Sequence, residues 1–113
     1  MITNKYNNIR VEYDGIKFSS KRECARYKQL KLMETSGVIG DLKLQPSFKL
    51  KAKIISRGFP NGREITYRAD FSYVITETDE YIVEDVKGME TKEFKIKKAF
   101  VFFFYGIDIK LVK

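Results

Sequence analysis

Alternating hydrophobic and polar positions divide the chain into short strands and two helices. Asp14-Gly15 separates two short extended segments, which predicts a small N-terminal hairpin. Ser19 or Ser20 then begins a helix that Gly37 ends. The predicted elements are hairpin strands at 11–13 and 16–18, extended structure at 42–55 broken at Gln45-Pro46, a turn at 56–63, strands at 65–76 and 81–87, a helix at 91–105 and a strand at 107–112.

The order of these elements after the hairpin is helix, three strands, helix, strand. This order predicts an α/β or α+β domain with a mixed central sheet. The helix at 91–105 would link two parallel strands by a right-handed crossover, and its aromatic run 100–104 is expected in the core. A chain of 113 residues can bury its own core, so residues 1–113 are expected to form a single domain.

The charge balance favours a polyanionic partner. Twenty-two Lys and Arg residues against fifteen Asp and Glu residues give a formal net charge of +7, and nucleic acid is the first candidate. An anionic membrane surface is the rival, but no basic amphipathic helix with an apolar face stands out. No apolar run approaches the roughly 20 residues that span a bilayer, and no signal peptide begins the chain, so the cytoplasm is the expected location.

The residue inventory excludes several kinds of chemistry. The chain has no histidine and one cysteine, Cys24, which excludes an internal disulfide, a Cys/His zinc site and a histidine-activated nucleophile. Cys24 is typical of a small buried thiol. Acid or base catalysis would therefore fall to carboxylates, lysines, tyrosines or metal-bound water.

Charged residues inside two predicted strands are the strongest functional signal. Side chains alternate with period two, so Asp85 and Lys87 share one face of their strand, and Glu84 lies on the other face with hydrophobic neighbours. If the strand 65–76 pairs with this one, Asp70 joins them. Two carboxylates and an ammonium suit a divalent cation beside a phosphate. The alternative is a solvated face of an edge strand.

Four short motifs carry a resemblance to a known family. They are Ser20-x-x-Glu23, Leu42-x-Leu44-Gln45-Pro46, Ala69-Asp70-Phe71 and Glu84-Asp85-Val86-Lys87-Gly88. In this order they resemble the PD-(D/E)xK nuclease superfamily, whose restriction-endonuclease-like core is helix, three strands, helix, strand. They are also similar to small phage-encoded proteins of this type and to the endonuclease subunit of heteromeric cut-and-paste transposases. The likeness covers about residues 10–112, with Ala69 in place of the proline that often precedes the first aspartate.

The resemblance implies a magnesium-dependent DNA endonuclease that hydrolyses phosphodiester bonds, with Mn²⁺ able to replace Mg²⁺. The metal ligands it implies are Asp70, Asp85, the backbone carbonyl of Val86 and Glu23, and Lys87 would stabilise negative charge on the phosphate. It further implies a homodimer that cleaves branched or junction DNA in phage recombination or replication, in the cytoplasm of the host cell. The alternative is a non-catalytic DNA-binding or adaptor module that keeps the fold.

Three polar residues have two interpretations each. Glu23 is either a metal ligand or the acid of a capping box with Ser20. Gln45 either binds a metal-linked water or phosphate, or is a polar residue at a strand bend before a proline. Glu84 would replace Asp85 as a ligand only if a bulge reversed the faces of its strand.

Basic residues outside the motifs are candidates for contacts with DNA phosphates. Arg57 and Arg63 lie in a predicted turn, and Lys92, Lys95 and Lys98 lie on the second predicted helix. The alternative for each of them is a solvated basic surface.

Overall fold

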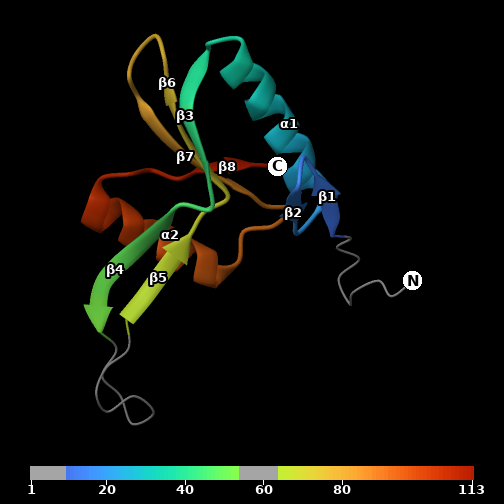
Figure 1. Cartoon of the computed structure of the whole chain (residues 1–113). Coiled ribbons are helices and arrows are strands. Elements are labelled where there is room, and N and C mark those ends of the chain that lie inside the picture. Colours follow the sequence, from blue (N-terminus) through green and yellow to red (C-terminus); the bar gives the residue numbers. More distant parts are fainter. Residues whose placement is uncertain (1–9, 54–63) are drawn as a thin grey trace.

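The structure, a computed structural model, describes residues 10–53 and 64–113. These residues form two helices and eight strands (Figure 1). In chain order the elements are β1 (Val11–Tyr13), β2 (Ile16–Phe18), α1 (Lys21–Thr35), β3 (Ile39–Leu44), β4 (Ser47–Lys53), β5 (Glu64–Arg68), β6 (Phe71–Ile75), β7 (Tyr81–Val86), α2 (Lys92–Tyr105) and β8 (Lys110–Val112).

A mixed four-stranded sheet lies at the centre of the fold. Its strand order is β3-β6-β7-β8, with antiparallel pairs except for β7 and β8, which are parallel and joined through α2. Helices α1 and α2 pack on opposite faces of this sheet, each over its own hydrophobic cluster. The predicted α/β class and the order helix, three strands, helix, strand are confirmed by α1, β3, β6, β7, α2 and β8.

Two long predicted strands are each divided between the sheet and a separate ribbon. The predicted interruption at Gln45 is confirmed, because this residue has a positive φ of 53° between β3 and β4. The single strand predicted at 65–76 is wrong: β5 pairs with β4 in a two-stranded ribbon, and β6 joins the sheet. The chain crosses between them at Asp70, whose backbone N–H donates to Glu84 O and whose carbonyl accepts from Gln45 N.

The turns and caps follow the local sequence. Asp14 and Gly15 both have positive φ, 59° and 76°, as a two-residue hairpin turn requires, so the predicted hairpin is confirmed. Ser20 caps α1 by accepting a hydrogen bond from Glu23 N, and Thr91 caps α2. The predicted turn at 56–63 lies outside the described residues, and only Lys110–Val112 of the predicted last strand is extended.

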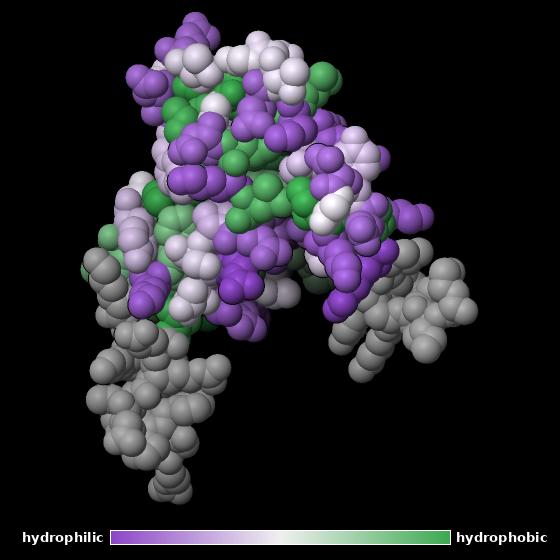
Figure 2. Space-filling view, viewed as in Figure 1, coloured by the Kyte–Doolittle hydropathy of each residue, from purple (hydrophilic) through white to green (hydrophobic). Residues whose placement is uncertain are grey.

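The aromatic run 100–104 is only partly in the core, so the expectation that it is buried is wrong. Val101 is fully buried and Phe104 half-buried, but Phe100, Phe102 and Phe103 are 41%, 59% and 79% exposed. Consecutive helical residues are about 100° apart, so a continuous run must surround the helix. Figure 2 shows hydrophobic side chains reaching the surface in the region of α2.

Neither described helix is long and apolar enough to cross a membrane.

Candidate metal and phosphate site

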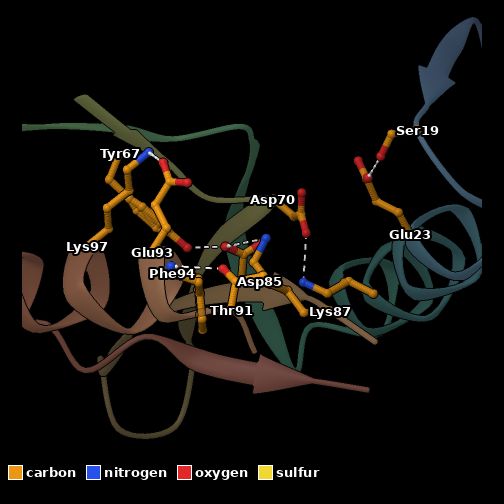
Figure 3. Close-up of polar contacts among 11 residues, drawn as sticks. Ser19, Glu23, Tyr67, Asp70, Asp85, Lys87, Thr91, Glu93, Phe94 and Lys97 are labelled. Atoms are coloured by element: carbon orange, nitrogen blue, oxygen red, sulfur yellow. Dashed lines mark hydrogen bonds and ion pairs between the residues drawn. The ribbon is translucent and has the colours of Figure 1, made fainter. Parts of the chain in front are cut away.

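Two aspartates from neighbouring elements meet on the α2 side of the sheet (Figure 3). Asp70 lies between β5 and β6, and its Oδ2 accepts a hydrogen bond of 2.7 Å from Val86 N. Asp85 is buried on β7, and Lys87 Nζ lies 3.8 Å from Asp85 Oδ2. The strands thus bring Asp70, Asp85 and Lys87 to one side of the sheet, as alternation predicts; their roles stay predictions.

The two carboxyls oppose each other electrostatically. Burial and a hydrogen bond with Asp85 raise the pKa of Asp70 to about 8, against the lowering effect of the Val86 N–H. The negative charge of Asp85 acts in the same direction, and that of Glu23 adds to it. The pair therefore favours a bound proton or a bound cation over two free carboxylates.

Without metal, the protein should lose stability as the pH rises through neutrality. The pKa of Asp70 rises from an ordinary 3.8 to about 8 on folding, so between these values the folded state holds a proton that the unfolded state has released. The stabilisation is complete below the lower pKa and is lost as the pH passes the upper one, with a loss on the order of 4 kcal/mol between about pH 5 and about pH 8. Chemical denaturation in chelator at about pH 5 and about pH 8 measures it.

Two asparagine variants make this measurement specific. Asp70→Asn should remove most of the decline with pH, because the titrating carboxyl is gone. Asp79→Asn, which removes an exposed carboxylate from the turn before β7, should keep the wild-type profile. An equal pH dependence in the wild type and in Asp70→Asn would contradict the account.

Tyr67 fixes the position of Asp85, and the sequence did not single out Tyr67 as a site residue. Its hydroxyl donates to Asp85 Oδ2. Burial and this hydrogen bond raise the pKa of Tyr67, so the hydroxyl remains a donor at neutral pH. The Lys87 ammonium is supported from the other side by the Phe94 ring, whose centroid lies 5.0 Å from Nζ.

A cleft of about 680 Å³ opens beside these side chains. Its lining joins the start of α1 to the end of β7, and consists of Ser19, Ser20, Lys21, Arg22, Glu23, Asp70, Asp85, Val86, Lys87, Gly88 and Met89. The lining thus combines carboxylates with basic side chains. Among residues 10–53 and 64–113, no three acids are grouped closely enough to hold a metal ion together.

Glu23 lines the cleft but does not join the aspartate pair. Its carboxylate accepts a hydrogen bond of 2.5 Å from Ser19 Oγ, as Figure 3 shows, and its backbone N–H donates to Ser20 Oγ. Ser20 therefore supplies its half of the predicted capping box, while the Glu23 side chain is held by Ser19. The predicted metal contact of Glu23 stays a prediction.

Glu84 lies on the opposite face of β7 and is fully buried. Arg26 donates to both of its carboxylate oxygens, at 2.8 and 2.6 Å, and the Tyr73 hydroxyl donates to one of them. Burial alone would raise the pKa of Glu84, but hydrogen bonds from Arg26 and Tyr73 lower it below the ordinary value. Pairing of β6 with β7 is regular here, so no bulge brings Glu84 to the cleft.

The other predicted residues that the structure describes lie outside the cleft. Gln45 is exposed, and its contribution is a backbone N–H that donates to Asp70 O. Lys92 and Lys95 are exposed on α2, whereas Lys98 Nζ lies 3.7 Å from Asp108 Oδ1. Arg57 and Arg63 lie outside the described residues.

Arg22 is a second residue that sequence reasoning missed. Its guanidinium lies over Gly88, so close that a Cβ added to Gly88 would stand 2.7 Å from Arg22 Nη1. Both residues line the cleft. The only sequence signal was a basic residue in the first turn of α1, beside Glu23.

The fold and the site together define a mixed α/β domain in which a buried aspartate, a partly buried aspartate and a lysine line one cleft. A family model described as "Protein of unknown function (DUF1064)" matches residues 3–112, so the chain belongs to this family. No curated protein and no solved structure matches this chain.

Proposed function

We propose that this protein is a divalent-metal-dependent endonuclease that hydrolyses phosphodiester bonds in DNA. The observation that carries the proposal is the pair of Asp70 and Asp85 beside Lys87 in an open cleft. Mg²⁺ is commonly held by one or two carboxylates together with substrate phosphates, so a pair of acids is a sufficient protein contribution. Mn²⁺ would fit the same oxygen ligands.

Each side chain has a role that its contacts support. Asp70 and Asp85 would hold the ion, with Glu23 and the Val86 carbonyl as further ligands from the same cleft. A bound divalent ion supplies positive charge that lowers the pKa of water and stabilises the charge on phosphate. Tyr67 and the Val86 N–H fix the two carboxylates, and Lys87 would bind the phosphate and stabilise its developing negative charge.

The net charge and the resemblance support DNA as the substrate and phage DNA metabolism as the biological setting. The net charge of +7 and the exposed Lys92 and Lys95 favour DNA. Cleavage selective for branched or junction DNA, a homodimer with two active sites, and a role in phage recombination or replication in the host cytoplasm follow from the resemblance alone.

A second candidate is a non-catalytic DNA-binding or adaptor module with the same fold. It is favoured by the position of Glu23, whose carboxylate contacts Ser19 instead of joining the aspartates. Such a module would bind DNA with a steep salt dependence and would be indifferent to Asp70→Asn.

Cleavage of linear, nicked and four-way DNA in Mg²⁺, in Mn²⁺ and in chelator tests the proposal. We expect metal-dependent cleavage, strongest on the branched substrate and absent in chelator. DNA binding with no cleavage of any substrate in either metal would favour the non-catalytic module.

The contact between Arg22 and Gly88 gives a test of the cleft as the place where DNA binds. Gly88→Ala should push the Arg22 guanidinium aside and weaken DNA binding about fivefold, which corresponds to about 1 kcal/mol. Arg22→Ala should weaken it equally. Because both changes remove the same contact, Gly88→Ala should have no further effect in the Arg22→Ala background. Fluorescence anisotropy of the four proteins measures the cycle, and losses that add would show that Arg22 does not act from this position.

A further inference from the structure

Helix α2 carries an exposed apolar stripe on the side away from the core. Ile96, Phe100 and Phe103 are 57%, 41% and 79% exposed, and they follow one face of the helix with Ala99 between them. These four residues line an apolar groove of about 410 Å³. The opposite side of α2 is buried through Phe94 and Val101, so the helix is hydrophobic on both sides.

A helix of this kind is normally covered on both sides. The exposed parts of the three large side chains and of the flanking Phe102 amount to on the order of 400 Å² of apolar surface. A contiguous patch of that size marks an interaction surface on a soluble monomer. Two such patches placed face to face would bury about half of the area of a standard interface, and the flanks of the helices would add the rest.

We infer that a second copy of this chain covers the stripe, with the two α2 helices antiparallel about a two-fold axis. The stripe has Ala99 and Phe100 at its centre and Ile96 and Phe103 at its ends. An antiparallel crossing at the centre would pack Phe100 of each copy against the small Ala99 of the other, and would place Phe103 of each copy against Ile96 of the other.

The charges near the stripe are compatible with an identical partner. The four stripe residues are uncharged, and two lysines elsewhere on α2 are ion-paired within the chain: Lys97 Nζ lies 3.0 Å from Glu93 Oε1 and Lys98 Nζ 3.7 Å from Asp108 Oδ1. A second copy supplies an apolar surface of the same extent, and the repulsion between two copies of a chain with +7 is screened at physiological salt.

The dimer would leave the cleft beside Asp70 and Asp85 open. None of the four stripe residues lines that cleft. The inference deepens the proposed function by placing its homodimer contact on α2, but it does not depend on the metal site, and its test needs neither DNA nor metal.

Sedimentation equilibrium of the full chain at about 50 μM tests the dimer. We expect twice the chain mass for the wild type and a dimer constant at least tenfold weaker for Phe103→Asp. Leu32→Asp is the matched control, because Leu32 is 68% exposed on α1, on the other face of the sheet, and this variant should keep the wild-type mass. A monomeric wild type, or equal dissociation by Leu32→Asp and Phe103→Asp, would overturn the inference.

Mixing two variants tests the antiparallel pairing. Ile96→Lys and Phe103→Asp should each be monomeric alone, but their equimolar mixture should restore the dimer mass, because one new lysine then faces one new aspartate. A mixture that stays monomeric would overturn the antiparallel arrangement. Circular dichroism of each variant verifies that the chain is folded.

Discussion

Asp70→Asn should reduce metal-dependent DNA cleavage by about 10³-fold or more. The substitution preserves the size of the side chain but removes a negative oxygen ligand from the pair with Asp85. A divalent ion contributes several kcal/mol to phosphoryl chemistry, and each 1.4 kcal/mol is a factor of about ten in rate. Single-turnover cleavage at saturating protein measures the effect on the chemical step.

A measurement of DNA affinity separates this loss of cleavage from a loss of DNA binding. Asp70→Asn removes a negative charge from the cleft, so its DNA affinity should equal or exceed that of the wild type. Lys87→Ala should also abolish cleavage, although it weakens binding slightly, and Asp79→Asn should cleave normally. Metal-dependent cleavage that persists unchanged in both Asp70→Asn and Lys87→Ala would contradict the assigned roles.

Arg26→Ala should destabilise the folded protein strongly. It would leave the carboxylate of Glu84, which is 0% exposed, with only the Tyr73 hydroxyl as a described partner. Breaking a buried ion pair from one side costs about 3–5 kcal/mol, a large part of the stability of a small domain. Urea denaturation at neutral pH measures this loss. The contact also holds α1, and with it Glu23, against β7, so cleavage should fall as well.

Two further variants separate the buried charge from the helix. Arg22→Ala makes the same change one turn earlier at an exposed position and should alter stability by about 0.5 kcal/mol or less. Arg26→Met with Glu84→Met and Tyr73→Phe removes the whole polar group and should recover most of the loss. Equal stability of Arg26→Ala and Arg22→Ala would show that the ion pair contributes little.

The face of β7 that carries Asp85 and Lys87 was predictable because the strand is regular. Each side of β7 contacts a different helix, so strict alternation separates Val83 and Asp85 from Ile82 and Glu84. The local sequence of β7 is therefore sufficient to predict which of its side chains share a face.

The break at Asp70 was not predictable from alternation. The residues on either side continue the same pattern, but those before it pack with α2 and those after it pack with α1. The crossing is fixed by two backbone hydrogen bonds, one that Asp70 N donates to Glu84 O and one that Asp70 O accepts from Gln45 N, and both partners are distant in the sequence. The Arg26–Glu84 pair, 58 positions apart, was missed for the same reason.

The exposure of the phenylalanines on α2 was predictable from the sequence. Helical periodicity assigns Val101 and Phe94 to one side and Phe100 and Phe103 to another. The expectation that the whole run 100–104 is buried did not apply this periodicity residue by residue.

Calorimetric titration of Mn²⁺ into the metal-free protein tests the central claim most directly, because it asks whether Asp70 and Asp85 form one cation site. The wild type and Asp79→Asn should show the same saturable binding at about pH 7.5, where the ion displaces the proton that Asp70 holds below its pKa of about 8. Asp70→Asn and Asp85→Asn should each lose it. Absence of saturable binding to the wild type, or binding as tight as that of the wild type by Asp70→Asn or by Asp85→Asn, would contradict the account.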